Sequence, residues 1–238
     1  TGKTTQISKL CKYFCKQGLS VLVTALTNRA LMEVAAKADL EDLLNEGRVY
    51  KTKMSVDEAK ELPQLKNIKQ LNPEKGNLML STFFITSGEA NNVLGLPPFD
   101  IVIMDEASQA LLAMFAAVKL LGSKTIFVGD PNQLSPVIAL NTDRITRRNY
   151  HFYINGITSI NTIEPIPSYS LTSTYRLTPR AAAFTGVFYR NQLQSAQNKI
   201  PNFVYDNLPY VFGDIIHNQG GPSLIKLDLP LGEKKPQS

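Results

Sequence analysis

The sequence predicts an α/β fold in which helices cover both faces of a parallel sheet. Short apolar runs recur over residues 20–26, 77–84, 99–107 and 124–130, and such runs are typical of strands buried on both faces. Segments with helical periodicity separate them, and strands that alternate with helices favour a parallel sheet. With 43% hydrophobic and 19% charged residues over 238 positions, the chain has enough apolar residues to form a buried core.

The first predicted helix follows directly after the opening residues TGKT. Its apolar residues recur at i, i+3, i+4 and i+7, namely Ile7, Leu10, Cys11 and Phe14. Gly18 is placed to end this helix in a left-handed conformation. The strand over 20–26 comes next, and a second helix is predicted to begin near Thr27 or Asn28.

The later elements differ in how clearly they are marked. Residues 45–76 are mixed and charged, and we interpret them as helix and loop. Beyond about residue 141 the chain is polar, aromatic and interrupted by prolines, which indicates a loop or a short insertion. The remaining predictions are a helix over 113–121 ended by Gly122, a helix over 179–190 that starts with Pro179, and a strand over 223–231.

Composition excludes several classes of protein. No apolar run is long enough to span a bilayer, so no membrane partner is expected. The two cysteines and two histidines offer no plausible zinc site, and we interpret Cys11 and Cys15 as buried thiols in a reducing compartment. The expected location is the cytoplasm, or the nucleus in a eukaryote. A net charge of +5 suits a polyanionic partner without identifying one.

The opening residues match part of a phosphate-binding loop. Gly2, Lys3 and Thr4 correspond to the last three letters of G-x-x-x-x-G-K-[ST], and the sequence starts inside such a loop. In these loops backbone N–H groups converge on phosphate oxygens, the lysine reaches the β- and γ-phosphates, and the hydroxyl binds Mg²⁺. Because G-K-T is a common tripeptide, it needs support from other motifs.

Two further motifs follow apolar strands. IVIMDEASQA delivers Asp105 and Glu106 to the end of a buried strand, where adjacent acids are costly unless a cation or a reacting water is present. TIFVGDPNQLSPV ends in a polar turn with Gln133, whose amide could sense a γ-phosphate. The alternative interpretations are a surface turn that caps a helix and an ordinary Gly/Asp/Pro turn.

The order of these motifs resembles superfamily 1 helicases. GKT, DEASQA, GDPNQLSPV and STYRLTP are similar to motifs I, II, III and IV of that family, and the similarity extends to FYRNQL near residue 194. The D-E-A-x-Q-A form of motif II resembles the subgroup that includes the RNA helicase of nonsense-mediated decay and several DNA helicases. The resemblance implies a RecA-like P-loop NTPase fold that uses ATP and Mg²⁺.

The resemblance also implies a role for each matching residue. Gly2, Lys3, Thr4 and Thr5 would bind nucleotide, Thr4 and Asp105 would hold the metal, and Glu106 would act on the hydrolytic water. Gln133 would couple nucleotide state to nucleic acid, and Gln109 would line the same cleft. Arg176 would reach the γ-phosphate, as its planar charged fork suits phosphate oxygens. Thr174 stands where relatives carry Gln, so the contact made by that Gln is in doubt.

Two segments resemble nucleic-acid motifs of the same family. TALTNRALMEV suggests that Thr27 and Asn28 begin a helix whose free N–H groups can bind a backbone phosphate. LMLSTFF suggests Ser81 and Thr82 as hydroxyl donors to phosphates or sugars. Simple helix capping and turn formation remain equally open at these residues. Arg144, Arg147 and Arg148 form a basic cluster that fits either a strand-binding patch or solvated loop charge.

The predicted organisation is a first RecA-like domain over 1–165 and the beginning of a second over 166–238. The predicted function is an ATP-dependent helicase or translocase that moves along single-stranded DNA or RNA. Without recognisable motifs V and VI, we expect the chain alone to be poorly active. The alternatives are a P-loop ATPase switch that gates partner binding without unwinding, and a degenerate scaffold, which the presence of Lys3, Asp105 and Glu106 disfavours. The sequence does not specify DNA or RNA, direction of travel, pathway, oligomeric state or protein partners.

Overall fold

The computed structural model describes residues 2–133, 136, 138, 141–163 and 166–197. These residues belong to two compact units, one spanning Lys3–Tyr169 and one containing the segment from Ser170 onward. The division of the chain into two RecA-like domains stays a prediction. The strand predicted over 223–231 lies outside the described residues.

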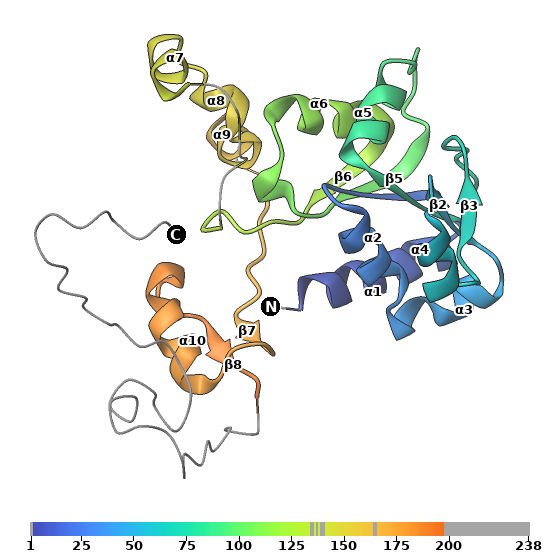
Figure 1. Ribbon diagram of the computed structural model, residues 1–238, viewed down its shortest axis with the longest axis horizontal. Helices are drawn as coiled ribbons and strands as arrows, with labels where there is room; N and C mark the ends of the chain where they lie inside the picture. The colour runs from blue at the N-terminus through green and yellow to red at the C-terminus, as the bar shows by residue number, and fades with distance from the viewer. Residues whose placement is uncertain (1, 134–135, 137, 139–140, 164–165, 198–238) are drawn as a thin grey trace, which may run out of the picture. The chain divides into compact units, whose positions relative to one another are not determined.

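A six-stranded parallel sheet is the centre of the larger unit (Figure 1). Its order is β3-β2-β4-β1-β5-β6, and every pairing between neighbours is parallel. The strands are β1 Val21–Ala25, β2 Val49–Thr52, β3 Lys66–Ile68, β4 Leu78–Thr82, β5 Phe99–Met104 and β6 Gly122–Phe127. This is the α/β, RecA-like fold that the sequence predicts.

Helices cover both faces of this sheet, as expected for strands that are apolar on both sides. Helices α1 and α2 lie on one face of the sheet and α5 and α6 on the other (Figure 1). Along β1, Val21 and Val23 pack in the apolar cluster of α1 and α2, whereas Leu22 packs in that of α5 and α6. The α-helices of this unit are α1 Lys3–Lys16, α2 Asn28–Ala35, α3 Glu41–Asn45, α4 Val56–Glu61, α5 Phe83–Ala90, α6 Leu112–Leu121, α7 Thr142–Arg147, α8 His151–Ile154 and α9 Gly156–Ile163.

Several predicted elements are confirmed with their end signals. Gly18 follows α1 at φ +74°, the left-handed conformation predicted for it. Thr27 caps α2, and its hydroxyl accepts the backbone N–H of Ala30 at 3.2 Å. Cys11 and Cys15 are buried free thiols. Burial raises the pKa of Cys11 well above its ordinary value and that of Cys15 to about 12, so both remain protonated and unreactive near neutral pH.

Residues 45–76 were predicted as helix and loop, which is wrong for two segments. They contain β2 and β3, which form one side of the sheet. Both strands are short, and polar residues such as Lys51 and Asn67 replace the apolar run that marks a central strand. Lys51 is nevertheless buried because its ammonium group is bonded inside the unit.

Two more boundaries differ from the prediction. The apolar run over 77–84 changes from strand to helix at Phe83, where α5 begins. The described residues between 141 and 163 form the short helices α7, α8 and α9, so the interpretation of this region as a loop is wrong, whereas a short insertion stays a prediction. Asn141 caps the first of these by accepting the Asp143 N–H at 2.7 Å. Ile157 and Ile160 of α9 pack against the apolar cluster of α6, which supplies the burial that helical periodicity alone did not reveal.

In the second unit, the described residues form a small parallel pair of strands, the α-helix α10 and the 3₁₀ helix η3, Val187–Tyr189. The strands are β7 Ser173–Thr174 and β8 Gln194–Ser195, and the α-helix is α10 Pro179–Gly186. The predicted start of this helix is confirmed, since Thr178 caps it and Pro179 occupies its first turn. No helix among the described residues is long and apolar enough to cross a membrane.

Candidate functional site

The connection from α1 to β1 places the start of the chain at the carboxyl edge of the sheet. The helix ends at Lys16 and β1 begins at Val21, so α1 runs back along the strand and its first turn lies where the strand ends. Gly2 precedes the helix at φ +74°, a conformation that glycine adopts without strain. Lys3 and Thr4 are half-buried in the first turn, beside backbone N–H groups that have no partner within the helix.

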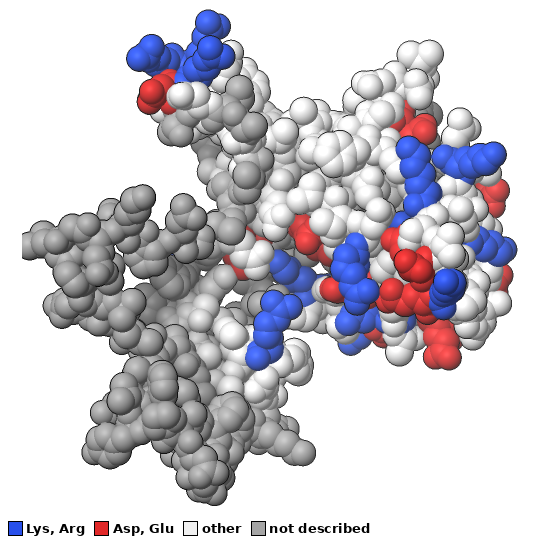
Figure 2. All heavy atoms as spheres, viewed as in Figure 1, with Lys and Arg blue, Asp and Glu red and all other residues white. Residues whose placement is uncertain are grey.

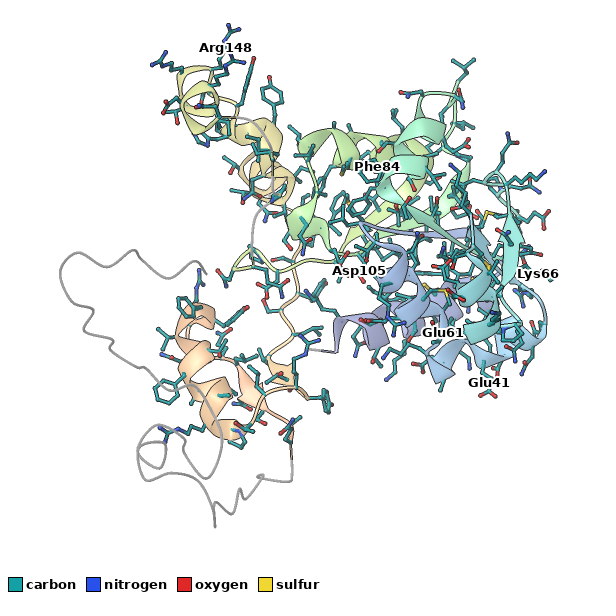
Figure 3. The ribbon with its side chains drawn as sticks, viewed as in Figure 1. Glu41, Glu61, Lys66, Phe84, Asp105 and Arg148 are labelled. Carbon is teal, nitrogen blue, oxygen red and sulfur yellow. The ribbon has the colours of Figure 1, made fainter. Side chains whose placement is uncertain are left out.

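The acid pair lies at the same edge, directly after β5 (Figure 3). The Asp105 N–H donates to the Thr24 carbonyl of β1 at 2.8 Å, which fixes the end of β5 against β1. Asp105 is only 6% exposed. Its Oδ1 accepts the backbone N–H of Glu106 at 2.8 Å, so one carboxylate oxygen helps to shape the turn that follows the strand.

Glu106 has a strained backbone. Its φ of 54° and ψ of 31° are left-handed, which for a non-glycine residue costs on the order of 1–3 kcal/mol. The turn is held on its far side by the Ala107 N–H, which donates to Val128 of the segment after β6 at 2.9 Å. Strain that the surroundings maintain in this way is characteristic of active sites.

The electrostatics of the acid pair depend mainly on burial. Burial raises the pKa of Asp105, whereas the Glu106 N–H and the Lys3 ammonium group oppose the rise. Burial also raises the pKa of Glu106, with repulsion from Asp105 adding to it, and the Leu26 N–H and Lys3 oppose it. The charge of Lys3 therefore favours the ionised form of both acids, which places Lys3 at the same edge of the sheet as the acid pair.

One oxygen of the pair lacks a partner. Glu106 Oε2 is buried and accepts no hydrogen bond from any described residue. A buried carboxylate oxygen without a donor costs free energy that a protein normally avoids. A raised pKa and an unsatisfied oxygen in one residue indicate a group suited to accept a proton or to orient a water molecule.

The donor set beside Lys3 fits Mg²⁺ better than a metal held by the protein alone. The described residues contain no group of three or more His, Cys, Asp or Glu side chains that could hold a metal ion. Magnesium, however, usually uses one or two protein ligands together with waters and substrate phosphates. The buried Asp105 carboxylate and the Thr4 hydroxyl supply hard oxygen ligands of this kind.

The other residues predicted to bind nucleotide differ in their relation to the acid pair. Gln109 ends the short 3₁₀ helix η2, Ala107–Gln109, and its N–H donates to the Glu106 carbonyl at 2.9 Å, so it shares the turn of the acid pair. The Gln133 side chain is exposed, and in the described structure no hydrogen bond joins it to Lys3, Asp105 or Glu106. Thr5 is half-buried in the first turn of α1. Arg176 is exposed in the second unit.

Thr174, the position in STYRLTP where the resembled family carries Gln, has a local structural role. Thr174 is buried, and its hydroxyl accepts the backbone N–H groups of Arg176 and Leu177 at 3.3 Å and 3.4 Å. A short hydroxyl side chain is suited to such a turn. Thr174 therefore shapes the backbone that carries Arg176, a role that the sequence did not predict.

The four predicted nucleic-acid residues fall into two groups. Thr27 and Asn28 are exposed at the start of α2, and Thr82 is half-buried at the end of β4. Ser81, by contrast, is fully buried and its hydroxyl pairs with that of Thr52 at 3.0 Å. Its hydroxyl contributes to strand packing, so the geometry gives no support to direct contact between Ser81 and a phosphate.

The sequence analysis missed a buried lysine that contacts Asn28, one of the predicted nucleic-acid residues. Lys51 of β2 is fully buried, and its ammonium group donates to Asn28 Oδ1 at 2.9 Å and to Glu58 Oε2 at 3.1 Å. Glu58 also completes a capping box with Ser55 at the start of α4. Lys51 thus ties α2 and α4 to the sheet and fixes the orientation of Asn28. The only available signal was a lysine inside the alternating segment VYKT.

The predicted arginine cluster is on a helix. Arg144, Arg147 and Arg148 lie on α7 or at its end and are exposed, as Figure 2 shows for the basic side chains of this helix. Asp143 is in the first turn of the same helix. The cluster fits solvated surface charge, and its role as a strand-binding patch stays a prediction.

The chain is similar in sequence to proteins named as helicases. The family described as an AAA domain matches residues 74–140. The chain is 30% identical over 154 residues to the DNA replication ATP-dependent helicase/nuclease DNA2 of Saccharomyces cerevisiae, covering 61% of this chain and 10% of that protein. It is 26% identical over 216 residues to DNA2 of Bos taurus, covering 88% of this chain and 20% of that protein. It is 32% identical over 140 residues to helicase SEN1 of Saccharomyces cerevisiae, covering 55% of this chain and 6% of that protein.

The matched relatives are much longer than this chain. The chain spans about a tenth to a fifth of the DNA2 relatives and less of SEN1. Among solved structures, the arterivirus nonstructural protein 10 helicase in complex with DNA is similar at a TM-score of 0.46 and 14% identity, over 87% of this chain and 43% of that one. The sequence matches confirm the resemblance to superfamily 1 helicases, and the D-E-A-x-Q-A subgroup stays a prediction.

Proposed function

We propose that this chain forms the nucleotide-binding part of an ATP-dependent nucleic-acid helicase or translocase, which couples Mg-ATP hydrolysis to movement along a single strand. The main supporting observation is that Lys3, in the first turn of α1, and the acid pair, directly after β5, lie at one edge of the parallel sheet although they are distant in the sequence, and the charge of Lys3 opposes the raised pKa of both acids. A cation, a hydroxyl and two acids at the carboxyl edge of a parallel sheet match the requirements of phosphoryl transfer.

Each residue has a distinct task in this proposal. Lys3 and the free N–H groups of α1 bind the phosphates. Thr4 and Asp105 would hold Mg²⁺, which when bound neutralises phosphate charge. Glu106 orients the attacking water and accepts its proton, a task that its raised pKa favours.

The remaining predicted residues support binding or coupling. Gly2 and Thr5 contribute to the phosphate loop, and Gln109 and Gln133 contact the nucleotide. For Arg176 we propose the role implied by the family, contact with the γ-phosphate, where a bidentate guanidinium is effective. These assignments rest on the motif matches.

The nucleic acid is proposed to bind along the ends of β1 and β4, at the exposed Thr27 and Asn28 and the half-buried Thr82. Two of the three relatives described above carry the name DNA replication ATP-dependent helicase/nuclease DNA2. Single-stranded DNA is therefore the first substrate to test, and RNA the second.

The test measures ATP hydrolysis by the full-length protein with and without single-stranded DNA or RNA. Either strand should stimulate hydrolysis, and Lys3→Ala should weaken nucleotide binding because the phosphate cation is lost. A directional displacement assay then separates a translocase from an ATPase switch. If neither strand stimulates hydrolysis and the protein displaces no strand, the helicase function is wrong and the ATPase switch becomes the proposed function. If Lys3→Ala binds nucleotide normally, the phosphate site lies elsewhere.

A further inference from the structure

Three segments meet where β2, β3 and β4 end. These strands are neighbours in the parallel sheet, so their carboxyl ends share one edge. Lys53 follows β2, Lys69 follows β3, and Phe84 lies in the first turn of α5, directly after β4. Together they line a shallow, open pocket with a volume of about 390 Å³. The pocket is separate from the acid pair, which follows β5.

Phe84 is unusually placed for a phenylalanine. Its side chain, labelled in Figure 3, is 71% exposed, whereas the adjacent Phe83 is buried in the core. The apolar cluster on this face of the sheet does not use the Phe84 ring. Covering such a ring stabilises a complex by about 1.5–3 kcal/mol, so the position is suited to a flat, apolar group from another molecule.

The two lysines give the pocket a basic rim. Lys53 and Lys69 are exposed, and neither has an acidic partner within ion-pair distance among the described residues. Glu89, in the last turn of α5, also lines the pocket and is its acidic member. The lysines outnumber it, so the rim favours an anion beside the ring.

The loop that carries Lys53 is held in place by the neighbouring strand. Lys53 has a left-handed φ of 50°, and its N–H donates to the Ile68 carbonyl at 3.3 Å. The next N–H, that of Met54, donates to Asn67 Oδ1 at 3.1 Å. The backbone is therefore ordered before a ligand binds, which reduces the entropic cost of binding.

We propose that Phe84 stacks on an unpaired base of a single strand of nucleic acid, while Lys53 and Lys69 contact the flanking phosphates. An exposed aromatic ring combined with unpaired cations is the arrangement by which proteins bind single strands with little sequence preference. This inference rests on the proposed nucleic-acid function and adds a binding subsite to it. The subsite extends the proposed path of the strand from Thr27 after β1, past Thr82 at the end of β4, toward the ends of β2 and β3.

The test compares two single-stranded DNA oligonucleotides of equal length, one normal and one whose central nucleotides are abasic. Binding to the full-length protein is measured by fluorescence anisotropy. Since stacking contributes about 1–3 kcal/mol per base, Phe84→Ala should weaken binding of the normal strand about 5- to 150-fold. It should leave binding of the abasic strand close to that of wild type, and Phe84→Tyr should restore affinity because its ring also stacks.

Two matched variants complete the experiment. Phe152→Ala removes another exposed aromatic ring of the same unit, which lies outside the pocket, and should bind both strands normally. Lys53→Gln and Lys69→Gln should each reduce the slope of log affinity against log salt by about 0.7, the value for one lost phosphate contact on a single strand.

The outcomes separate the subsite from the function on which it rests. If wild-type protein binds no single strand, the proposed function fails. If it binds but Phe84→Ala binds the normal strand equally well, only the subsite is wrong. Equal losses on the normal and abasic strands would also overturn stacking, because no base would then be involved. Thermal unfolding of each variant checks that the exposed position can be changed without loss of the fold.

Discussion

The two halves of the sheet's carboxyl edge treat buried charge in opposite ways. After β5, Asp105 and Glu106 have raised pKa values, and one Glu106 oxygen has no described partner. On β2, Lys51 is fully buried but donates to Asn28 and Glu58. The first half leaves its charges incompletely satisfied, whereas the second satisfies them within the protein.

This difference separates chemistry from support. A buried ion pair with additional hydrogen bonds stabilises one arrangement of its helices, and Lys51 accordingly fixes the starts of α2 and α4. An unsatisfied acid pair lowers stability and is retained where a ligand or a reaction requires it. The proposed nucleotide site therefore lies in the half whose charges are less satisfied, and the Lys51 network in the other half holds α2 and α4 in place.

The largest expected effect is on hydrolysis at Glu106. Glu106→Gln keeps the shape of the side chain but cannot accept a proton from water. We expect ATP turnover in the full-length protein to fall about 10²- to 10⁴-fold, with nucleotide affinity retained because Lys3 is unchanged. Single-turnover hydrolysis and equilibrium binding measure the two quantities. Normal turnover in this variant would remove Glu106 from its role.

The next largest effect is on the stability that the buried Lys51 provides. Lys51→Met leaves the Glu58 carboxylate, which is 14% exposed, without its main cation. We expect a loss of about 3 kcal/mol in the free energy of unfolding, measured by urea denaturation. Adding Glu58→Gln should recover part of this loss because the uncompensated charge is removed.

A surface pair provides the control for Lys51. Lys12 contacts Asp42 at 2.8 Å, but both side chains are substantially exposed. Lys12→Met should change the free energy of unfolding little, because water and salt screen exposed pairs. A loss as large as that of Lys51→Met would show that burial does not explain the difference.

A smaller effect of opposite sign is expected at Asp105. Its folded-state pKa is raised by burial, so its ionisation becomes an increasing cost as pH rises through that pKa. Asp105→Asn removes the charge and should stabilise the fold by on the order of 1 kcal/mol above that pH, while metal-dependent hydrolysis is lost. Urea denaturation at a series of pH values measures the difference in the free energy of unfolding between this variant and wild type. The difference should shrink as the solution becomes acidic.

Asp100 provides the matched comparison. The Ser20 N–H and hydroxyl each donate to Asp100 Oδ2 at 2.8 Å and hold the pKa of this carboxyl below its usual value. Its contribution to stability is present above the unfolded-state pKa and is lost as pH falls through the folded one. Asp100→Asn should therefore destabilise the protein at neutral pH. If both variants shift stability in the same direction, the contrast between the two acids is wrong.

The sequence predicts the elements that carry strong local signals. The strands β1, β4 and β5 are apolar runs, and Gly18 and Thr27 mark the end of α1 and the start of α2. The relation between Lys3 and the acid pair was also accessible, because carboxyl ends of parallel strands share an edge.

The remaining features depend on tertiary contacts. Lys51 is buried only because Asn28 and Glu58 reach it from α2 and α4, so β2 looked like loop. Ser81 looked accessible until its partner Thr52 was placed on the neighbouring strand. The left-handed Glu106 and the exposed Phe84 leave no periodic signal, since both depend on how the chain turns after a strand.

The most direct test of the central claim is a crystal structure of the full-length protein with Mg²⁺ and a non-hydrolysable ATP analogue. The account predicts the β- and γ-phosphates beside Lys3 and the first turn of α1, with Asp105 and Glu106 facing the metal and the terminal phosphate. A triphosphate bound away from Lys3, or one to which the acid pair has no access, would contradict it.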